Sequence, residues 1–553
     1  MNEALEGFVP YPAKIAQEYR RKGYWKGRTL NEHLENWVAR FADRIAIVAD
    51  RQRISYRDLG MQVANAATHL AALGIRRGDR VVMQLNNIPE FIYVTFGLMR
   101  IGALPIMALP AHRDTEIRYL LEFSGAVAYA APLEFRGFNY LDMVRRIAPD
   151  APRLKHLLIA GENLPQDANA HSIGAMLRQP NPAGEALVSE RSPSSSDVAF
   201  FLLSGGTTGL PKLIPRTHDD YEYNFDAAAE VSGLTENTVY LIALPISHNF
   251  PLGSPGVMGV FSRGARVVLT PSPSPETAFP VVESERVTMT AHVPAVTIQW
   301  LSSPLRDKYN LSWLQLLQVG GSRLSAEVAA RVKPLLGATV QQVYGMAEGL
   351  LNFTHIDDPD EVLFNTQGRP LSPADEIRIV DWSGNPAAPG EPGELLTRGP
   401  YTIRGYYKAP EHNAKAFTED GFYRTGDVVR LTESGNLSVE GRVKDLINRG
   451  GEKISAEEVE NLILRHPSVL NVAIVAMPDP VMGEKVCAYV IAREQAVLSL
   501  EELRQFMDAA GISKFKLPER LELVERFPLT TVGKISKKDL REDIAAKLRA
   551  EGK

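Results

Sequence analysis

The segment from residue 204 to residue 212 combines the residue types that bind phosphate. It reads Ser-Gly-Gly-Thr-Thr-Gly-Leu-Pro-Lys and follows a short apolar run at residues 198–203. Glycines let the backbone approach a ligand closely, and N–H groups and hydroxyls that converge in a loop form a cradle for anions. Because Leu210 and Pro211 stand before Lys212, the segment is not a P-loop, in which Gly-Lys-Ser/Thr opens a helix. We assign phosphate binding to Ser204, Gly205, Gly206, Thr207, Thr208, Gly209 and Lys212; the alternative is an ordinary Gly/Thr hairpin loop.

Three charged residues further along the chain are weak signals when each is taken alone. Lys534 lies in Val-Gly-Lys-Ile-Ser-Lys-Lys, where a lysine is usually a solvated surface charge. Glu348 follows Met-Ala and by itself suggests only a helix-forming surface residue. Asp427 follows a glycine, as in many turns. A chemical role for any of them depends on whether it belongs to a longer pattern.

The composition is that of an ordinary globular protein with more than one domain. The chain has 553 residues, which exceeds the size at which single hydrophobic cores stop growing. Hydrophobic residues make up 44% and charged residues 23%. The net charge is −5 and the basic residues are spread along the chain, so we expect no nucleic acid partner and no anionic membrane surface.

The expected compartment is the cytoplasm. The one cysteine, Cys487, excludes an internal disulfide and a cysteine-rich zinc site, and it suits a reducing environment. The first residues show no basic region followed by an apolar run, so we expect no signal peptide. The longest apolar runs are strand-sized and too short to cross a membrane.

Short apolar runs alternate with amphipathic stretches over most of the chain, which predicts α/β architecture. The expected strands are residues 80–85, 198–203, 239–244, 266–269 and 316–319, and the expected helices include residues 56–73 and 326–336. Residues 180–197 are rich in Pro and Ser and predict a surface loop.

From about Gly441 onward charged residues become denser, and helical and strand patterns alternate over shorter distances. Helical and strand patterns alternate through residues 457–465, 472–477, 485–491 and 500–509. We therefore predict an N-terminal domain of residues 1–440 and a small α+β domain of residues 441–553.

Five motifs in order resemble those of the adenylate-forming superfamily, which includes acyl-CoA synthetases, luciferases and the adenylation domains of peptide synthetases. The first is the phosphate-binding segment. Residues 344–348 (Tyr-Gly-Met-Ala-Glu) resemble the family's adenine-and-magnesium motif, and residues 423–427 (Tyr-Arg-Thr-Gly-Asp) resemble its ribose-binding motif. Residues 441–445 (Gly-Arg-Val-Lys-Asp) resemble its hinge, and Gly533-Lys534 resembles its catalytic lysine. Because the five motifs occur in the same order, the chain is identified as a member of this superfamily.

The resemblance implies a large multi-subdomain N-terminal adenylating domain, a small mobile C-terminal domain, and ATP and Mg²⁺ as cofactors. Lys534 would bridge the acyl carboxylate and the α-phosphate, and Glu348 would bind Mg²⁺ together with Thr208. Asp427 would accept hydrogen bonds from the ribose, beside Arg442. The other residues implied at the ATP site are Gly321, Tyr344 (against adenine), Gly345 and Met346. The resemblance also makes Lys444 the hinge and places Gly450 and Gly451 along the pantetheine channel.

Residues 245–252 (Pro-Ile-Ser-His-Asn-Phe-Pro-Leu) resemble the stand-alone aryl-acid ligases of siderophore synthesis. In that subgroup His248 would gate the site beside the acyl carboxylate, unless it is merely structural, and Asn249 would bind the carboxylate and ortho-hydroxyl side of the ring. The hydroxyl of Ser254 favours 2,3-dihydroxybenzoate, whereas Leu351 and Phe250 favour salicylate. The implied substrate-binding residues are His248, Asn249, Phe250, Ser254, Gly320, Ser322 and Leu351. We favour 2,3-dihydroxybenzoate slightly.

The acceptor of the acyl group stays open between two thiols. The subgroup resemblance implies an aryl carrier protein with a phosphopantetheine arm, acting in trans because the chain ends soon after Lys534. An aryl-CoA ligase would share the first half-reaction and use coenzyme A. A non-catalytic nucleotide-binding scaffold and a luciferase-like oxygenase are more distant alternatives.

Overall fold

The computed structural model describes residues 5–161, 164, 169–190, 192–204, 210–450, 452–493, 496–530 and 534–551. Predicted site residues outside the described residues are Gly205, Gly206, Thr207, Thr208, Gly209 and Gly451. No helix of the described residues has the length and apolar character needed to cross a membrane.

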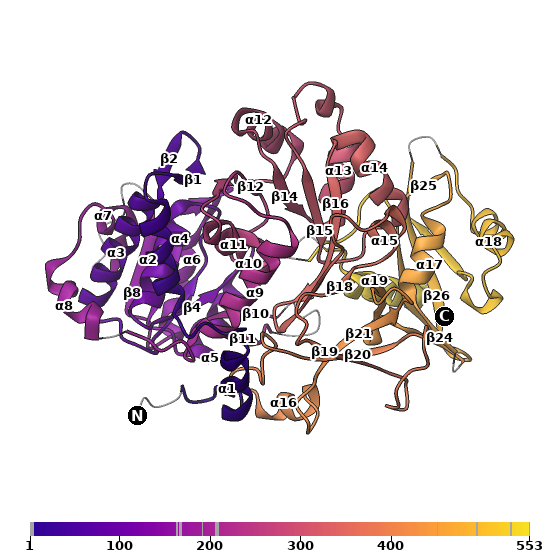
Figure 1. Ribbon diagram of the computed structural model, residues 1–553. Helices are drawn as coiled ribbons and strands as arrows, with labels where there is room; N and C mark the ends of the chain where they lie inside the picture. The colour runs from indigo at the N-terminus through magenta and orange to yellow at the C-terminus, as the bar shows by residue number, and fades with distance from the viewer. Residues whose placement is uncertain are drawn as a thin grey trace.

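Two large sheets, mostly parallel, organise the N-terminal part of the chain (Figure 1). The seven-stranded sheet has the order β11 (Leu213–Thr217), β10 (Val198–Leu203), β4 (Leu104–Met107), β3 (Arg80–Met83), β5 (Ala128–Pro132), β8 (His156–Ala160) and β9 (Ala170–Ser172). The nine-stranded sheet has the order β18 (Arg369–Pro370), β17 (Gly349–Phe353), β16 (Thr339–Met346), β15 (Leu316–Gly320), β14 (Met289–His292), β12 (Val239–Ile242), β13 (Arg266–Leu269), β1 (Ile45–Ala49) and β2 (Gln52–Ser55).

Helices alternate with these strands, and some of them begin at polar caps. Ser55 accepts from the Asp58 N–H at the start of α3 (Tyr56–Ala72), and Thr217 accepts from the Asp220 N–H at the start of α9 (His218–Val231). Further helices beside the sheets are α2 (Leu30–Phe41), α4 (Pro89–Arg100), α5 (Asp114–Ser124), α12 (Pro275–Glu285), α13 (Pro294–Ser302) and α14 (Ala326–Leu336).

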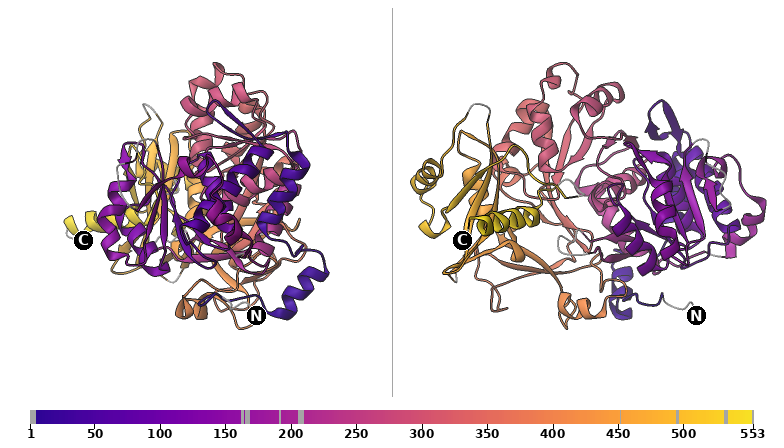
Figure 2. Two further views of the ribbon diagram at one scale, coloured as in Figure 1. Left: turned by 90° about the vertical axis from the view of Figure 1, so that its left-hand side faces the viewer. Right: turned by 180° about the vertical axis from the view of Figure 1, so that it is seen from behind.

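A four-stranded antiparallel sheet follows and leads into the C-terminal part. Its strands are β19 (Glu376–Val380), β20 (Gly393–Arg398), β21 (Tyr423–Leu431) and β22 (Leu437–Arg442). The view from behind in Figure 2 shows this sheet, in orange, next to the yellow C-terminal elements.

The C-terminal sheet is buried on both faces. It consists of β23 (Ile447–Arg449), β24 (Glu452–Ile454), β25 (Val469–Asp479), β26 (Gly483–Ala492) and β27 (Arg520–Leu523). Alternate residues of β25 face α17 (Ala456–Ile463) and α18 (Leu500–Ala509) on one side and α19 (Lys537–Ala550) on the other. Cys487 lies fully buried on the α19 side, where burial raises its thiol pKa to about 12.

The predicted fold class is confirmed: the chain is α/β with a small α+β C-terminal part. The expectation of a loop over residues 180–197 is wrong in part, because Pro182–Glu190 form helix α8. Pro182 stands at its start, a position that proline tolerates well. Gly184 lets α8 lie directly on α3, since a Cβ at Gly184 would stand 1.8 Å from the Thr68 carbonyl oxygen.

Candidate active site

The two ends of the predicted phosphate-binding loop are held together. The Lys212 N–H donates to Ser204 Oγ over 3.0 Å, and the Ser204 N–H donates to the Lys212 carbonyl over 3.0 Å. These bonds continue the antiparallel pairing of β10 with β11, so the two strands form the stem of the loop. The ammonium of Lys212 lies 5.8 Å from the centre of the Tyr406 ring.

Several residues predicted for the acid and ATP sites come together at the carboxyl ends of the nine-stranded sheet. His248 and Asn249 follow β12, Gly320 ends β15, and Tyr344 lies near the end of β16. Ligands of open parallel sheets bind outside the carboxyl ends of the strands. The sheet therefore places residues that lie about a hundred positions apart in the sequence at one edge.

Hydrophobic residues of the predicted acid pocket pack against glycines. The ring of Phe250 approaches Gly320, because a Cβ on Gly320 would lie 3.0 Å from Phe250 Cε1. Leu351 is paired with Gly345 across β17 and β16, and a Cβ on Gly345 would lie 2.3 Å from Leu351 Cδ2. Both glycines make room for side chains that the sequence analysis assigned to the aryl ring.

Polar groups of the pocket form a short buried chain. The Tyr221 hydroxyl donates to Asn249 Oδ1 over 3.0 Å, and Asn249 Nδ2 donates to Ser254 Oγ over 3.4 Å. Tyr221, Asn249 and Ser254 are all buried. Ser322, in contrast, is exposed on the segment between β15 and α14, and its place in the pocket stays a prediction.

His248 presents a neutral ring. Its Nδ1 accepts the Phe250 N–H over 3.3 Å, so the neutral ring carries its proton on Nε2. Burial, with a smaller contribution from the charge of Lys534, lowers the pKa of His248 to about 4. At pH 7 the side chain is therefore an Nε2–H donor, as a gate beside a carboxylate would require.

Asp427 is held between two side chains. Arg442 Nε donates to its Oδ1 over 2.7 Å, and the Tyr344 hydroxyl donates to its Oδ2 over 2.7 Å. β21 and β22 set this arrangement, because Asp427 and Arg442 are direct partners in their register. A carboxylate has about four acceptor positions, so each oxygen keeps capacity for a ribose hydroxyl.

Glu348 is buried and bonded by a tyrosine. The Tyr406 hydroxyl donates to Glu348 Oε1 over 2.7 Å, and Tyr423 lies behind it with a hydroxyl-to-hydroxyl distance of 2.8 Å. Burial raises the pKa of Glu348, and the Tyr406 hydrogen bond opposes that shift.

A single carboxylate fits the way Mg²⁺ is bound with a nucleotide. Among the described residues, no three His, Cys, Asp or Glu side chains gather to hold a metal ion by themselves. Mg²⁺ in such sites takes one or two carboxylates and completes its shell with phosphate oxygens and waters. The hydrogen bond from Tyr406 uses one lone pair of the Glu348 carboxylate. The remaining lone pairs are of the hard oxygen type that binds Mg²⁺.

Lys534 reaches from the C-terminal part into this group of residues. A Cβ placed on Gly321 would lie 3.2 Å from Lys534 Cε and 3.8 Å from Nζ. The backbone of Lys534 is fixed by two hydrogen bonds with Thr530, which donates its N–H to the Lys534 carbonyl and accepts the Lys534 N–H at Oγ1. Burial, followed by the charge of Arg442, lowers the pKa of Lys534 to about 8.

A decline of kcat/KM for MgATP above about pH 8 is expected from this pKa. The ratio reports ionisations of the free enzyme, and the deprotonated amine would no longer attract the phosphates. The decline in kcat should occur at higher pH, because bound anions favour the charged lysine. Steady-state rates from pH 6 to 10 test this. A Lys534→Arg variant should lose the alkaline decline, and its persistence in that variant would assign the decline to another group.

The remaining predicted residues lie at the junction with the C-terminal part. Lys444 is in a short 3-10 turn, Val443–Asp445, directly after β22. Gly450 has φ +59° at the turn between β23 and β24, and its N–H donates to the Met482 carbonyl over 2.8 Å. The hinge, the domain boundary and the pantetheine channel stay predictions.

Three residues near the site were not found from the sequence: Arg216, Tyr221 and Tyr406. Arg216 is fully buried and donates to the Ala347 carbonyl over 3.0 Å, next to Glu348. Tyr406 lies in the Gly-Tyr-Tyr stretch of residues 405–407, which is the one local signal that could have drawn attention to it.

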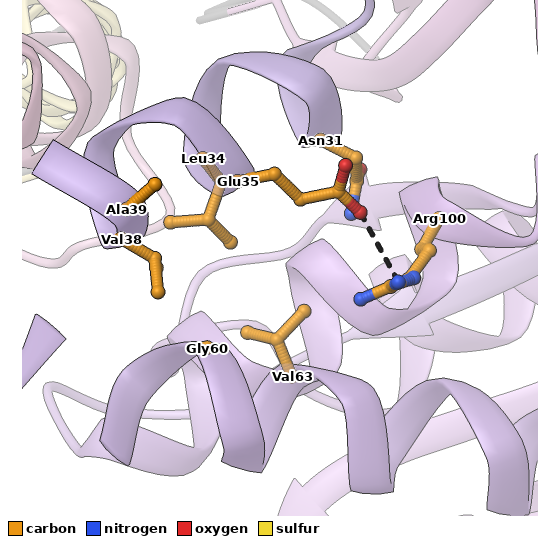
Figure 3. Close-up of a pocket in the computed structure, with 8 residues that line it drawn as sticks. All are labelled: Asn31, Leu34, Glu35, Val38, Ala39, Gly60, Val63 and Arg100. Atoms are coloured by element: carbon orange, nitrogen blue, oxygen red, sulfur yellow. Dashed lines mark ion pairs between the residues drawn. The ribbon is translucent and has the colours of Figure 1, made fainter. Parts of the chain in front are cut away.

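A separate surface pocket of about 380 Å³ lies between α2, α3 and the end of α4 (Figure 3). Leu34, Val38 and Val63 contribute its apolar wall. Its charged groups, Glu35 and Arg100, are paired at 3.1 Å. None of the predicted site residues lines it, and it offers no cradle for a triphosphate.

Comparison with known proteins identifies the family. Residues 34–407 match the model of the AMP-binding enzyme family, and residues 458–534 match that of the AMP-binding enzyme C-terminal domain. The chain is an AMP-binding enzyme. It is 52% identical to the 2,3-dihydroxybenzoate-AMP ligase of Bacillus subtilis (strain 168), with 99% of each chain covered. It is 51% identical to a salicylyl-CoA synthase / salicylate adenylyltransferase of a Streptomyces species, with 98% of each covered.

A solved structure supports the same relationship. The apo structure of MbtA from Mycobacterium smegmatis superimposes with a TM-score of 0.75 at 45% identity, covering 98% of this chain and 100% of that one. The predicted membership of the adenylate-forming enzymes, and the resemblance to stand-alone aryl-acid ligases among them, are confirmed.

Proposed function

We propose that this AMP-binding enzyme activates an aryl carboxylic acid, with 2,3-dihydroxybenzoate favoured, and transfers it to the phosphopantetheine thiol of an aryl carrier protein in siderophore biosynthesis. The observation that carries the proposal is the position of Lys534. Its side chain lies against Gly321, its charge lowers the pKa of His248, and Arg442 in turn lowers its own pKa. The positive charge of Lys534 thus lies between the predicted acid pocket and the predicted ribose site.

In the first step, an oxygen of the aryl carboxylate attacks the α-phosphorus of ATP. The new bond forms as the bond to the pyrophosphate oxygen breaks, and pyrophosphate leaves. Two anions meet in this step, so a fixed positive charge at Lys534 lowers the barrier. Glu348 would hold Mg²⁺, which would neutralise further charge on the phosphates. Asn249 and His248 orient the acid through N–H donors, and Asp427 with Arg442 holds the ribose.

In the second step, a pantetheine thiol attacks the acyl carbon and AMP leaves. The C-terminal part would turn about Lys444 to bring Gly450 and the adjoining turn to the adenylate. A hinge of this kind absorbs a large backbone change at one or two residues.

Two features of the pocket weigh on the choice of acid. Ser254 is 1% exposed, and a 3-hydroxyl on the ring could bond its hydroxyl. Ser254 Oγ already accepts from Asn249, and its own proton could be donated to the 3-hydroxyl oxygen, a hydrogen bond worth about 0.5–1.5 kcal/mol that favours the dihydroxy acid. Leu351 occupies more of the pocket than a smaller aliphatic residue would, but one methylene changes discrimination by only about 1–3 kcal/mol.

Acid-dependent ATP–pyrophosphate exchange with 2,3-dihydroxybenzoate, salicylate, benzoate and anthranilate tests the proposal. We expect the highest kcat/KM with 2,3-dihydroxybenzoate. A lead for salicylate would mean that Leu351 and Phe250 dominate the choice. Absence of exchange with all four acids would exclude the proposed substrate class.

The second candidate is an aryl-CoA ligase, which the name of the Streptomyces relative favours. The rate of AMP release distinguishes the two candidate functions. It is measured after the enzyme-bound adenylate is mixed with coenzyme A or with a phosphopantetheinylated aryl carrier protein. We expect faster release of AMP with the carrier protein. Faster release with coenzyme A would replace the proposed acceptor and leave the adenylation step unchanged.

A further inference from the structure

A tyrosine behind the predicted acid pocket bears on substrate choice. Tyr221 lies on α9, which packs beside the short helix α10 (Asn249–Gly253) (Figure 1). Its hydroxyl donates to Asn249 Oδ1 over 3.0 Å in a fully buried setting. Tyr221 is not itself assigned to the ring; it contacts Asn249, which is.

Three contacts fix the position of the Tyr221 ring. The guanidinium of Arg216 lies 4.7 Å from the ring centre, and Phe200 packs edge-on with centroids 4.6 Å apart. In front, the hydroxyl passes Gly253, where a Cβ would stand only 2.4 Å from the oxygen. The missing side chain at Gly253 is therefore what lets Tyr221 reach Asn249.

The hydrogen-bond roles at Asn249 follow from the chemistry of its two neighbours. A phenol is a stronger donor than acceptor, and the positive charge of Arg216 on the ring face strengthens the donor further. Tyr221 therefore takes the amide oxygen, which turns the Asn249 NH₂ group toward Ser254. That NH₂ group has two protons, and only one is needed for Ser254 Oγ.

We infer that Tyr221 is a positioning residue that sets substrate specificity: by holding Asn249 Oδ1 it makes the amide present an N–H donor to the ortho substituent of the acid. The inference rests on the proposed function. An ortho oxygen, as in salicylate and 2,3-dihydroxybenzoate, can accept this hydrogen bond. The ortho amino group of anthranilate is mainly a donor and would meet a second donor, and benzoate has no ortho substituent.

The test compares Tyr221→Phe with Tyr240→Phe in ATP–pyrophosphate exchange. Tyr240 is a matched control, because it is a buried tyrosine of β12 whose hydroxyl has no partner among the described residues. For Tyr221→Phe we expect kcat/KM to fall roughly 5- to 10-fold for salicylate and 2,3-dihydroxybenzoate, mainly through KM, as expected for one hydrogen bond. The kcat/KM for benzoate and the KM for ATP should each change less than about twofold.

A second variant reverses the polarity at Asn249. Asn249→Asp keeps an oxygen toward Tyr221 and replaces the N–H donor by an acceptor, so the anthranilate-to-salicylate ratio of kcat/KM should rise. An equal loss for benzoate and salicylate in Tyr221→Phe, or an unchanged ratio in Asn249→Asp, would overturn the inference alone. A wild-type enzyme without exchange on any of these acids would overturn the proposed function and this inference with it.

Discussion

Replacing Lys534 by alanine is expected to lower kcat of acid-dependent pyrophosphate exchange by roughly 100- to 1,000-fold, the usual cost of removing one charge-stabilising group. The side chain lies against Gly321, and we propose that its charge acts where the carboxylate meets the α-phosphorus. Transfer of the acyl group from preformed aryl-adenylate to the thiol should largely survive, because that step separates the anions again.

The two half-reactions are measured separately, by pyrophosphate exchange and by AMP release from supplied adenylate. Lys538→Ala is the matched control: Lys538 lies on the neighbouring helix α19, its side chain is 50% exposed, and its nearest carboxylate is that of Glu542 at 3.7 Å. We expect that variant to retain both activities. Equal loss of both steps in Lys534→Ala would contradict the assigned role.

Arg216→Met is expected to reduce the free energy of unfolding by about 3–5 kcal/mol, the typical cost of breaking a buried ion pair. Arg216 is 0% exposed, and its Nε donates to Asp220 Oδ1 over 2.7 Å. Its other nitrogens donate to the carbonyls of Ala347 and Tyr401. Methionine would fill the space but would leave Asp220 and both carbonyls without these donors.

Tryptophan fluorescence during urea unfolding is a suitable measurement, because all five tryptophans precede residue 441. Arg57→Met is the control: the Arg57–Asp43 pair is 66% and 89% exposed, so its loss should cost no more than about 1 kcal/mol. Adding Asp220→Asn to Arg216→Met should recover part of the stability, since the uncompensated charge is removed. Similar urea midpoints for Arg216→Met and Arg57→Met would show that the buried pair contributes little.

Much of the fold could be predicted from local pattern. The strands at residues 198–203 and 266–269 and the helices at residues 326–336 and 500–509 have the predicted bounds, because apolar periodicity and flanking polar residues mark them clearly. The helix α8 was missed because the loop signal of Pro and Ser outweighed a short helical stretch, and its stability comes from contact with α3.

The candidate site likewise contains residues that could be predicted from the sequence and residues that could not. Residues in contiguous motifs, such as Glu348 and Asp427, could be predicted by resemblance. Tyr221, Tyr406 and Arg216 could not, because the contacts that give them a role span 28, 58 and 131 positions of the chain. Such contacts are products of the tertiary fold and leave no local pattern in the sequence.

The buried thiol of Cys487 has a practical consequence for following conformational change. Its side chain is 0% exposed and its pKa is raised by burial, so a maleimide dye should leave it unmodified in the folded protein. A cysteine introduced at an exposed position of α18 would then be labelled alone, without first removing the natural one. Energy transfer from the tryptophans to that dye would report the proposed turn of the C-terminal part about Lys444 in real time.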